Sequence, residues 1–289
     1  MVRKIGDRYD GRLIRSLDAF YKIIPFIMKK REDAQVYFND KVEIDNTEAY
    51  IRAQNAYSNN KIGFLHVVIA AVVRTISQKP GLNRFVAGQR IFARNEILIS
   101  LSIKKELNET SSETVIKMKF SPTDTIHDIV DKVNTAVVEN KKNDTENGTD
   151  KTANLFMMCP RFLVNFLVGI IKFLDYYGIM PKVINKVSPF HTSIYITDLG
   201  SLGIKPVYHH IYNFGTTSCF ISFGKKEKEK VINKENHIVE KRFVELKVVV
   251  DERICDGHYY AGAIKLLKKL IQNPERLEVP PKNVIKDID

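Results

Sequence analysis

The sequence predicts an α/β domain, because apolar residues recur with the period of a strand and with the period of a helix along its 289 residues. Residues 243–250 alternate with a period of two, as a strand does. Residues 259–271 place apolar side chains three and four positions apart, as in a helix that ends before Pro274. Residues 251–257, Asp-Glu-Arg-Ile-Cys-Asp-Gly, lie between the two. Charges at the carboxyl end of a strand are often functional, and a solvated turn is the alternative.

The other expected elements follow from the same two periods. Helices are expected over 16–30, 46–51, 61–77 and 125–137, and strands over 34–44, 97–103, 114–120 and 216–223. Pro25 should kink the first helix, and Thr125 with Asp128 forms a pattern that starts a helix. Residues 224–230 alternate Lys with Glu, which predicts a solvated hairpin tip.

The composition argues against several classes of function. The net charge of +11 favours nucleic acid, anionic membranes or a phosphorylated ligand as partners. The basic residues do not interleave with aromatic residues as on an RNA-binding surface, so nucleic acid is not expected. No window of about 18 apolar residues occurs, and the start lacks a signal-peptide core. We therefore expect a cytoplasmic protein without a transmembrane segment.

The cysteines and histidines give no sign of a metal site or a disulfide. Cys159, Cys219 and Cys255 form no CxxC pair, so reduced thiols are expected. Cys255 lies in the central stretch, where a small buried thiol is favoured over a nucleophile. His66 is expected in the core, because no second ligand lies at metal-binding spacing.

Several stretches resemble the catalytic domain of the dihydrolipoyl acyltransferases of 2-oxo acid dehydrogenase complexes. Residues 251–257 resemble their Asp-His-Arg-x-x-Asp-Gly signature and the related His-x-x-x-Asp-Gly of chloramphenicol acetyltransferase. Glu252 stands at the position of the catalytic histidine. Residues 192–204 are similar to their Thr-Phe-Thr-Ile-Ser-Asn-Leu-Gly segment. The Pro-Gly-Leu-Asn turn at 80–83 and the Asn-Pro-Glu-Arg-Leu ending at 273–277 also look like that family.

The resemblance covers nearly the whole chain and implies one domain with a chloramphenicol acetyltransferase-like fold. This fold is a mixed sheet covered by helices on one side, with the strand at 243–250 in its centre. The acyltransferase-like domain would span 16–279, with a mobile loop at 139–154. An N-terminal extension at 1–15 and a C-terminal tail at 280–289 would flank it. No lipoyl domain is expected in this chain, and a homotrimer is expected because the family builds its site between subunits.

The resemblance also implies coenzyme A as a substrate and an acyl-CoA or other acyl thioester as the acyl donor. The candidate catalytic residues are Glu252, Asp256, Thr197 and His258, and the candidate coenzyme A-binding residues are Thr197, Asp198, Leu199 and Gly200. In the family, a histidine is the general base and a serine hydroxyl, matched here by Thr197, helps to bind the oxyanion. Asp198 replaces an asparagine and adds a negative charge. Asp256 is implied to be structural and to pair with an arginine, for which Arg12 and Arg15 are candidates.

Two classes of function remain open after this comparison. One is a coenzyme A-dependent acyltransferase in which Glu252, or with less weight His258, serves as the base. The other is a non-catalytic relative that binds coenzyme A, an acyl group or a partner and assembles with an active acyltransferase.

The apolar segment at 156–180 also has two interpretations. It could lie on a membrane surface, or it could lie near the acyl pocket or a neighbouring subunit. The second is favoured, because the polar face is thin for a helix that lies on a membrane.

Overall fold

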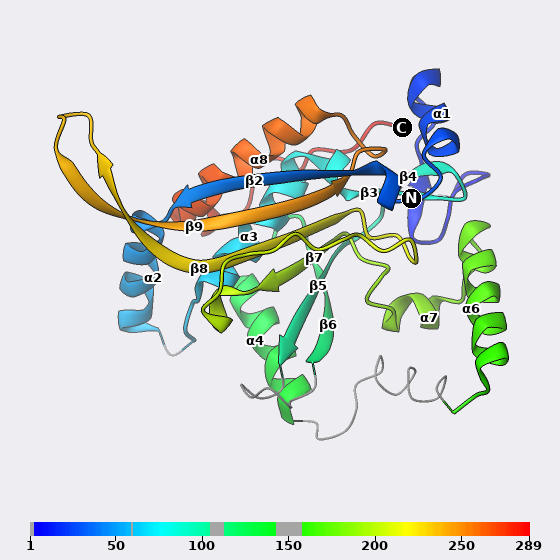
Figure 1. The fold of residues 1–289 in the computed structure, drawn as a ribbon, viewed down its shortest axis with the longest axis horizontal. Coiled ribbons are helices and arrows are strands. Elements are labelled where there is room, and N and C mark those ends of the chain that lie inside the picture. The colour runs from blue at the N-terminus through cyan, green and yellow to red at the C-terminus, as the bar shows by residue number, and fades with distance from the viewer. Residues whose placement is uncertain (1–2, 59, 105–112, 143–157) are drawn as a thin grey trace.

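The computed structural model describes residues 3–58, 60–104, 113–142 and 158–289, and it contains two sheets (Figure 1). The larger sheet has the strand order β2-β9-β8-β7-β5-β6, and the smaller one has the order β1-β4-β3. β7 pairs in parallel with β5 and β8, and the other pairs are antiparallel. The strands are β1 Gly11–Leu13, β2 Gln35–Glu43, β3 Arg84–Ala87, β4 Arg90–Arg94, β5 Ile97–Lys104, β6 Glu113–Phe120, β7 Ile194–Asp198, β8 Cys219–Ile232 and β9 Ile238–Asp251. The expected mixed sheet is confirmed.

The helices are α1 Ala19–Ile27, α2 Asp45–Tyr57, α3 Phe64–Gln78, α4 Ile126–Lys142, α6 Arg161–Tyr176, α7 Lys182–Val187 and α8 Gly257–Gln272. Of these, α2, α3, α4 and α8 pack together on one face of the larger sheet, whereas α1, α6 and α7 lie towards the end of the molecule opposite the β8–β9 hairpin (Figure 1). α3 is buried along most of its length and packs against both α4 and α8 (Figure 1). Its sides are apolar nearly all round, as expected of a helix inside the core. Within the described ranges, no helix has the length and apolar character needed to cross a bilayer.

The strand at 243–250 differs from its predicted place. It belongs to β9, which lies second from one edge of the sheet rather than in the centre, between β2 and β8. The predicted hairpin tip at 224–230 was also wrong, because these residues continue β8 and the turn lies at 233–237. This strand pair projects beyond the sheet (Figure 1). Ion pairs across it, such as Lys228 with Glu240 at 2.7 Å, align its two strands.

Two predicted helices have different lengths, and one predicted loop is partly helical. The first helix is shorter than 16–30 and keeps the buried Pro25 inside its last turn. The second extends well beyond 46–51, to Tyr57. Residues 139–142 of the predicted loop at 139–154 belong to α4, and the rest of that loop lies outside the described residues.

Both ends of the chain take part in the fold. β1 pairs with β4, and the last residues lie beside the first ones (Figure 1). Arg12 contacts Asp289 at 2.8 Å, and the largely buried Arg84 pairs with Asp287. The terminal segments therefore close the fold over β3 and β4.

A buried ionic cluster fixes the C-terminal end of α6. Arg8 contacts Asp10 at 2.8 Å and Asp175 at 2.7 Å. His191 Nε2 lies 3.3 Å from Asp175 Oδ2, and Lys117 donates to the Asn185 carbonyl at 2.7 Å. These groups come from three distant parts of the sequence, residues 8–10, 117 and 175–191, so the cluster joins α6 and α7 to the N-terminal segment and to β6.

This cluster makes stability depend on pH. Burial lowers the pKa of His191, so its imidazole is neutral in the fold at pH 7. Burial alone would raise the pKa of Asp175, but its hydrogen bond to His191 and the charge of Arg8 hold it well below the usual range. Both groups bind more protons in the unfolded chain, so lower pH favours unfolding.

We expect the free energy of unfolding to fall as the pH drops from about 7 to 5, across the unfolded pKa of histidine, and again below about 4. Urea denaturation followed by circular dichroism at several pH values measures this. His191→Gln should flatten part of the first decline, because it removes one titrating group while His66, whose pKa is also lowered by burial, remains. A variant that keeps the full slope would show that other groups cause it.

Candidate functional site

At the end of β9, two of the three consecutive charged side chains at 251–253 are buried. Arg253 donates to Asp251 through Nε at 2.7 Å and through Nη2 at 2.6 Å, and both side chains are buried. The buried guanidinium of Arg31 lies 3.6 Å from the same carboxylate. Arg253 also donates to the carbonyl of Met28 at 2.9 Å. The pair therefore joins the end of β9 to the segment that follows α1.

Glu252, between these two residues, is exposed. Its backbone N–H donates to the Ala34 carbonyl at 2.9 Å, and the chain turns directly after β9, where the Ile254 N–H donates to the Asp251 carbonyl at 3.2 Å. This turn buries the side chains of Asp251 and Arg253 and leaves Glu252 facing the solvent.

Asp256 caps the N-terminus of α8 and does not pair with an arginine. Its carboxylate accepts the Tyr259 N–H at 2.7 Å and the Tyr21 hydroxyl at 3.3 Å. The expected pairing with Arg12 or Arg15 was wrong, because Arg12 contacts Asp289 and Arg15 contacts Asp7. An aspartate at this position satisfies an otherwise unpaired N–H of the helix.

The two other polar groups of this stretch differ in exposure. His258 is exposed in the first turn of α8. Cys255 is buried, and burial raises the pKa of its thiol to about 12. A thiol that stays protonated at neutral pH is a poor nucleophile, which agrees with the small buried role expected for Cys255.

The second predicted stretch lies at the carboxyl end of β7. Thr197 is half-buried and lies in register with Ser222 of β8. Asp198 Oδ1 accepts the Ser201 N–H at 3.0 Å, and burial raises the pKa of Asp198 despite this hydrogen bond. A Cβ atom at Gly200 would come within 2.6 Å of the Gly224 carbonyl oxygen, so only glycine fits this turn. The turn is therefore packed closely against β8.

Within one chain, the structure does not bring the two stretches together. Thr197 is in register with Ser222, and Ser222 is in register with Lys247 of β9. Lys247 precedes Glu252 by five positions, which corresponds to about 16 Å along the strand. Two strand spacings of about 4.8 Å each separate them further. Thr197 and Glu252 of the same chain therefore cannot contact one reacting group.

A pocket of about 350 Å³ lies beside α1. Its buried floor is apolar and includes Ile14 and Ile91, and the cationic side chains of Lys22 and Arg90 are exposed at its rim. The neighbouring Tyr21 donates to Asp256, so α1 contributes to the pocket and also contacts the stretch at 251–257. Sequence reasoning did not find this pocket, because its residues come from separate segments.

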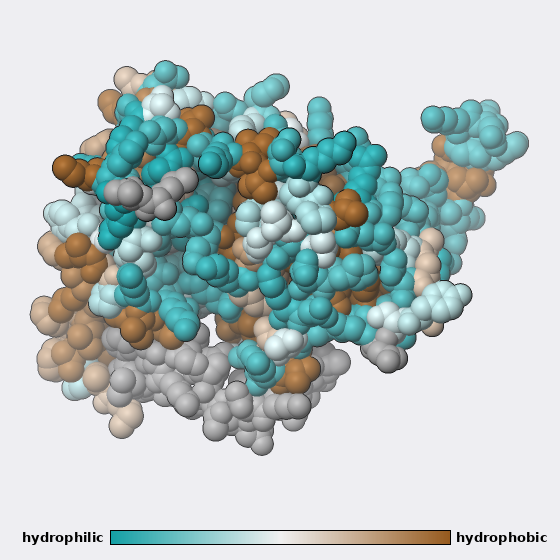
Figure 2. Space-filling view, turned by 180° about the vertical axis from the view of Figure 1, so that it is seen from behind, coloured by the Kyte–Doolittle hydropathy of each residue, from teal (hydrophilic) through white to brown (hydrophobic). Residues whose placement is uncertain are grey.

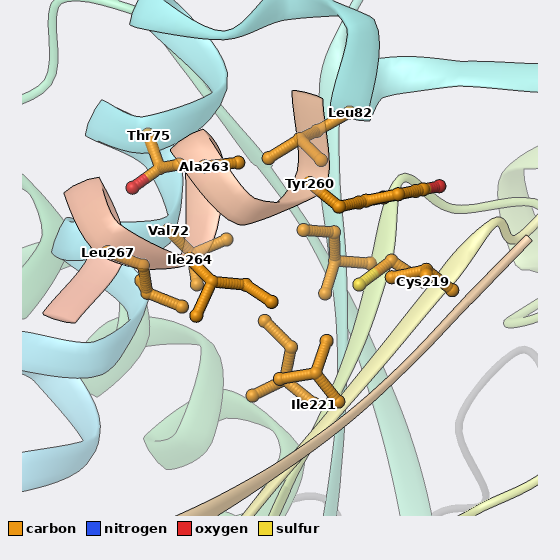
Figure 3. Close-up of a pocket in the computed structure, with 12 residues that line it drawn as sticks. Val72, Thr75, Leu82, Cys219, Ile221, Tyr260, Ala263, Ile264 and Leu267 are labelled. Carbon is orange, nitrogen blue, oxygen red and sulfur yellow. The ribbon is translucent and has the colours of Figure 1, made fainter. Parts of the chain in front are cut away.

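A smaller cavity of about 30 Å³ lies between the sheet and the helices α3 and α8. Figure 3 shows Cys219, Ile221 and Tyr260 around it, with Thr75 as the polar side chain at its edge. The space suits at most a water molecule and forms part of the core. Among the described residues, no group of three His, Cys, Asp or Glu side chains is placed to hold a metal ion.

The comparisons with known proteins agree with this architecture. Residues 190–279, which include both stretches, match the family model for the 2-oxoacid dehydrogenases acyltransferase (catalytic domain). A search of curated proteins gave no match. Three solved structures illustrate the fold. A probable dihydrolipoamide acetyltransferase from Listeria monocytogenes is 16% identical, with a TM-score of 0.57 over 95% of this chain and 97% of that chain.

The dihydrolipoamide acetyltransferase of Azotobacter vinelandii is 12% identical, with a TM-score of 0.59 over 96% of this chain and 94% of that chain. A chloramphenicol acetyltransferase is 11% identical, with a TM-score of 0.56 over 90% and 99%. At sequence identities this low, structural similarity establishes the fold only. The activity has to be inferred from the residues of the site. The resemblance found in the sequence is confirmed: residues 190–279 match the catalytic domain of the 2-oxoacid dehydrogenase acyltransferases, and the chain has the fold of dihydrolipoamide and chloramphenicol acetyltransferases.

Proposed function

We propose that this chain binds coenzyme A and its acyl thioesters at an acyltransferase-type site, and that it transfers the acyl group slowly or not at all. The proposed binding of coenzyme A rests on the match of residues 190–279 to the family model. This range contains both the turn at 197–200 and the stretch at 251–257. The pocket beside α1 supports it, because an apolar floor suits an acyl group and a cationic rim suits phosphates.

The separation of the two stretches supports a site between copies of the chain. Thr197 of one copy and residues 251–257 of another could face one ligand, whereas those of a single copy lie too far apart. A related core, that of the pyruvate dehydrogenase multienzyme complex, forms a cubic assembly. The expected homotrimer fits this arrangement.

Light scattering coupled to size-exclusion chromatography measures the oligomeric state. We expect a mass of about three chains at micromolar protein, because a cyclic trimer repeats the same interface, and with it the same shared site, between each pair of copies. A monodisperse monomer under the same conditions would remove the shared site from the proposal.

The proposal that acyl transfer is slow or absent rests on the residue at the position of the general base. In the Azotobacter vinelandii enzyme a serine, a histidine and an asparagine have a role in catalysis, and the histidine precedes the asparagine by four positions. Glu252 precedes Asp256 by the same number, so Glu252 would stand where the base is needed. Its carboxylate is exposed, and water competes for a proton acceptor that is not shielded. Transfer would therefore run without a well-placed general base.

A second candidate function is acyl transfer with another base. His258 favours it, because it lies six positions after Glu252 and is exposed in the first turn of α8. An imidazole titrates near neutral pH, as a general base must. His258→Gln would then abolish a transfer activity that the wild type shows.

Calorimetric titration with coenzyme A tests whether the protein binds this ligand. Binding should be saturable and should weaken as salt rises, because phosphate contacts are screened. We expect Asp198→Asn to bind coenzyme A about two- to tenfold more tightly, since an exposed or partly buried charge contributes about 0.5–1.4 kcal/mol. The amide can keep the hydrogen bond from the Ser201 N–H and loses only the negative charge.

Glu235→Gln in the turn between β8 and β9 is the matched control, because it also removes a single negative charge and lies in the projecting hairpin, away from both stretches (Figure 1). Equal affinity of wild type and Asp198→Asn would show that Asp198 does not face the ligand. Failure of the wild type to bind at millimolar coenzyme A would contradict the proposal as a whole.

A further inference from the structure

Helix α6 exposes a stripe of aromatic side chains. Phe162, Phe166, Phe173 and Tyr177 are between 59% and 75% exposed. They follow one another at intervals of four, seven and four positions, which places them on the same side of a helix. Figure 2 shows hydrophobic residues along the edge of the molecule where α6 lies. We call these four residues the aromatic stripe.

The opposite side of α6 already packs against its own chain. Ile171 is buried, and Leu167 and Leu174 are half-buried on that side. Apolar side chains therefore occupy two sides of the helix, and the exposed Arg161, Asn165 and Lys172 lie on the narrower polar side between them. Exposed apolar patches of this kind mark interaction surfaces. Among the described residues, none packs over the aromatic stripe enough to bury it, so we expect another surface to bind there.

The charges around the stripe have one sign. Between residues 158 and 188 the cationic side chains are exposed; they are Arg161, Lys172, Lys182 and Lys186. The single acid of this segment, Asp175, is turned inward, where Arg8 contacts it at 2.7 Å and His191 lies 3.3 Å away. The ionic cluster thus removes the one negative charge from the surface that carries the stripe.

We propose that α6 docks on the surface of an anionic lipid bilayer. The aromatic side chains would enter the interface, and the four cationic side chains would contact lipid phosphates. A two-fold contact with a second copy of the chain fits less well, because the stripe of one copy would meet that of the other and bring like charges together. A contact of the stripe with another face of a second copy is one outcome of the test below. An anionic surface supplies the opposite charge. α6 lies at the end of the molecule opposite the β8–β9 hairpin, so a flat surface can reach it (Figure 1).

Flotation with lipid vesicles tests this docking. We expect the wild type to float with vesicles of phosphatidylcholine and phosphatidylglycerol, and not with phosphatidylcholine alone. Added salt should release it, because the lipid charges are screened. Phe166→Ser combined with Phe173→Ser should abolish flotation. Arg161→Gln combined with Lys172→Gln should lower the partition coefficient at least about tenfold, from about 1 kcal/mol for each cationic residue.

Matched controls distinguish binding through the aromatic stripe from non-specific binding of the protein to vesicles. Tyr57→Ser removes an exposed aromatic residue from α2, at the other end of the molecule. Lys265→Gln combined with Lys269→Gln changes the net charge by the same amount on α8. Both should float like the wild type, and circular dichroism should show every variant folded.

Three outcomes would overturn the proposal. The wild type could fail to float with anionic vesicles, or the Phe166 and Phe173 variant could float as well as the wild type. Light scattering could also show that the same variant loses an oligomeric state that the wild type has. That result would assign the stripe to a contact between copies of the chain.

Discussion

Asp251→Ala is expected to lower the free energy of unfolding by about 3–5 kcal/mol, because it leaves buried guanidinium groups without their carboxylate. Arg253 donates two hydrogen bonds to Asp251, and Arg31 lies 3.6 Å from it. Burial already lowers the pKa of Arg31 to about 10, with Asp251 opposing that shift. Removal of the one negative charge therefore leaves two buried positive charges side by side. Urea denaturation followed by circular dichroism measures the loss.

The neighbouring residue provides the control. Glu252→Ala changes an exposed carboxylate at the next position, in the turn after β9, and it should alter the free energy of unfolding by no more than about 0.5 kcal/mol. The double variant Asp251→Leu with Arg253→Met should recover part of the loss, because an apolar pair replaces a broken ionic one. Equal stability of Asp251→Ala and Glu252→Ala would show that the buried pair does not hold the end of β9.

The second large effect concerns catalysis. Acyl transfer by the wild type is expected to be about 10²–10⁴-fold slower than that of a relative with a positioned base, which is the usual contribution of general base catalysis. The measurement is transfer from acetyl-CoA to dihydrolipoamide, with the Azotobacter vinelandii enzyme as the reference. Glu252→Gln should leave the slow rate unchanged, because an exposed carboxylate contributes little as a base.

If Glu252 is itself the general base, the same assay should give the opposite result. If Glu252 removes the proton, Glu252→Gln should abolish transfer while it leaves coenzyme A affinity nearly intact. Glu252→His restores the family signature but should restore little activity, since Asp198 also departs from the family. Robust transfer by the wild type that Glu252→Gln does not affect would contradict both accounts and point to His258 or another residue.

The fold was predictable wherever one face of an element is buried. The strands at 97–103 and 114–120 correspond closely to β5 and β6, because each alternates over a buried face. The start of α4 was also predictable, since Thr125 and Asp128 form the reciprocal hydrogen bonds of a capping box. The hairpin at 224–230 was not, because both faces of the projecting ribbon meet water and its alternation is only between charges of opposite sign.

The place of the stretch at 251–257 in the fold was predictable, but its contacts were not. The sequence correctly predicted a strand before this stretch and a helix after it. It gave no sign that Asp251 and Arg253 are buried, because their partners, Arg31 and the Met28 carbonyl, come from a distant segment and the chain turns between the two residues.

A structure of the protein with coenzyme A bound tests the central claim most directly. The account predicts coenzyme A between two copies of the chain, with the turn at 197–200 of one copy and the stretch at 251–257 of the other against it. Glu252 would lie near the thiol end without a hydrogen bond to it. Coenzyme A held by a single copy, or absent from both stretches at millimolar ligand, would contradict the account.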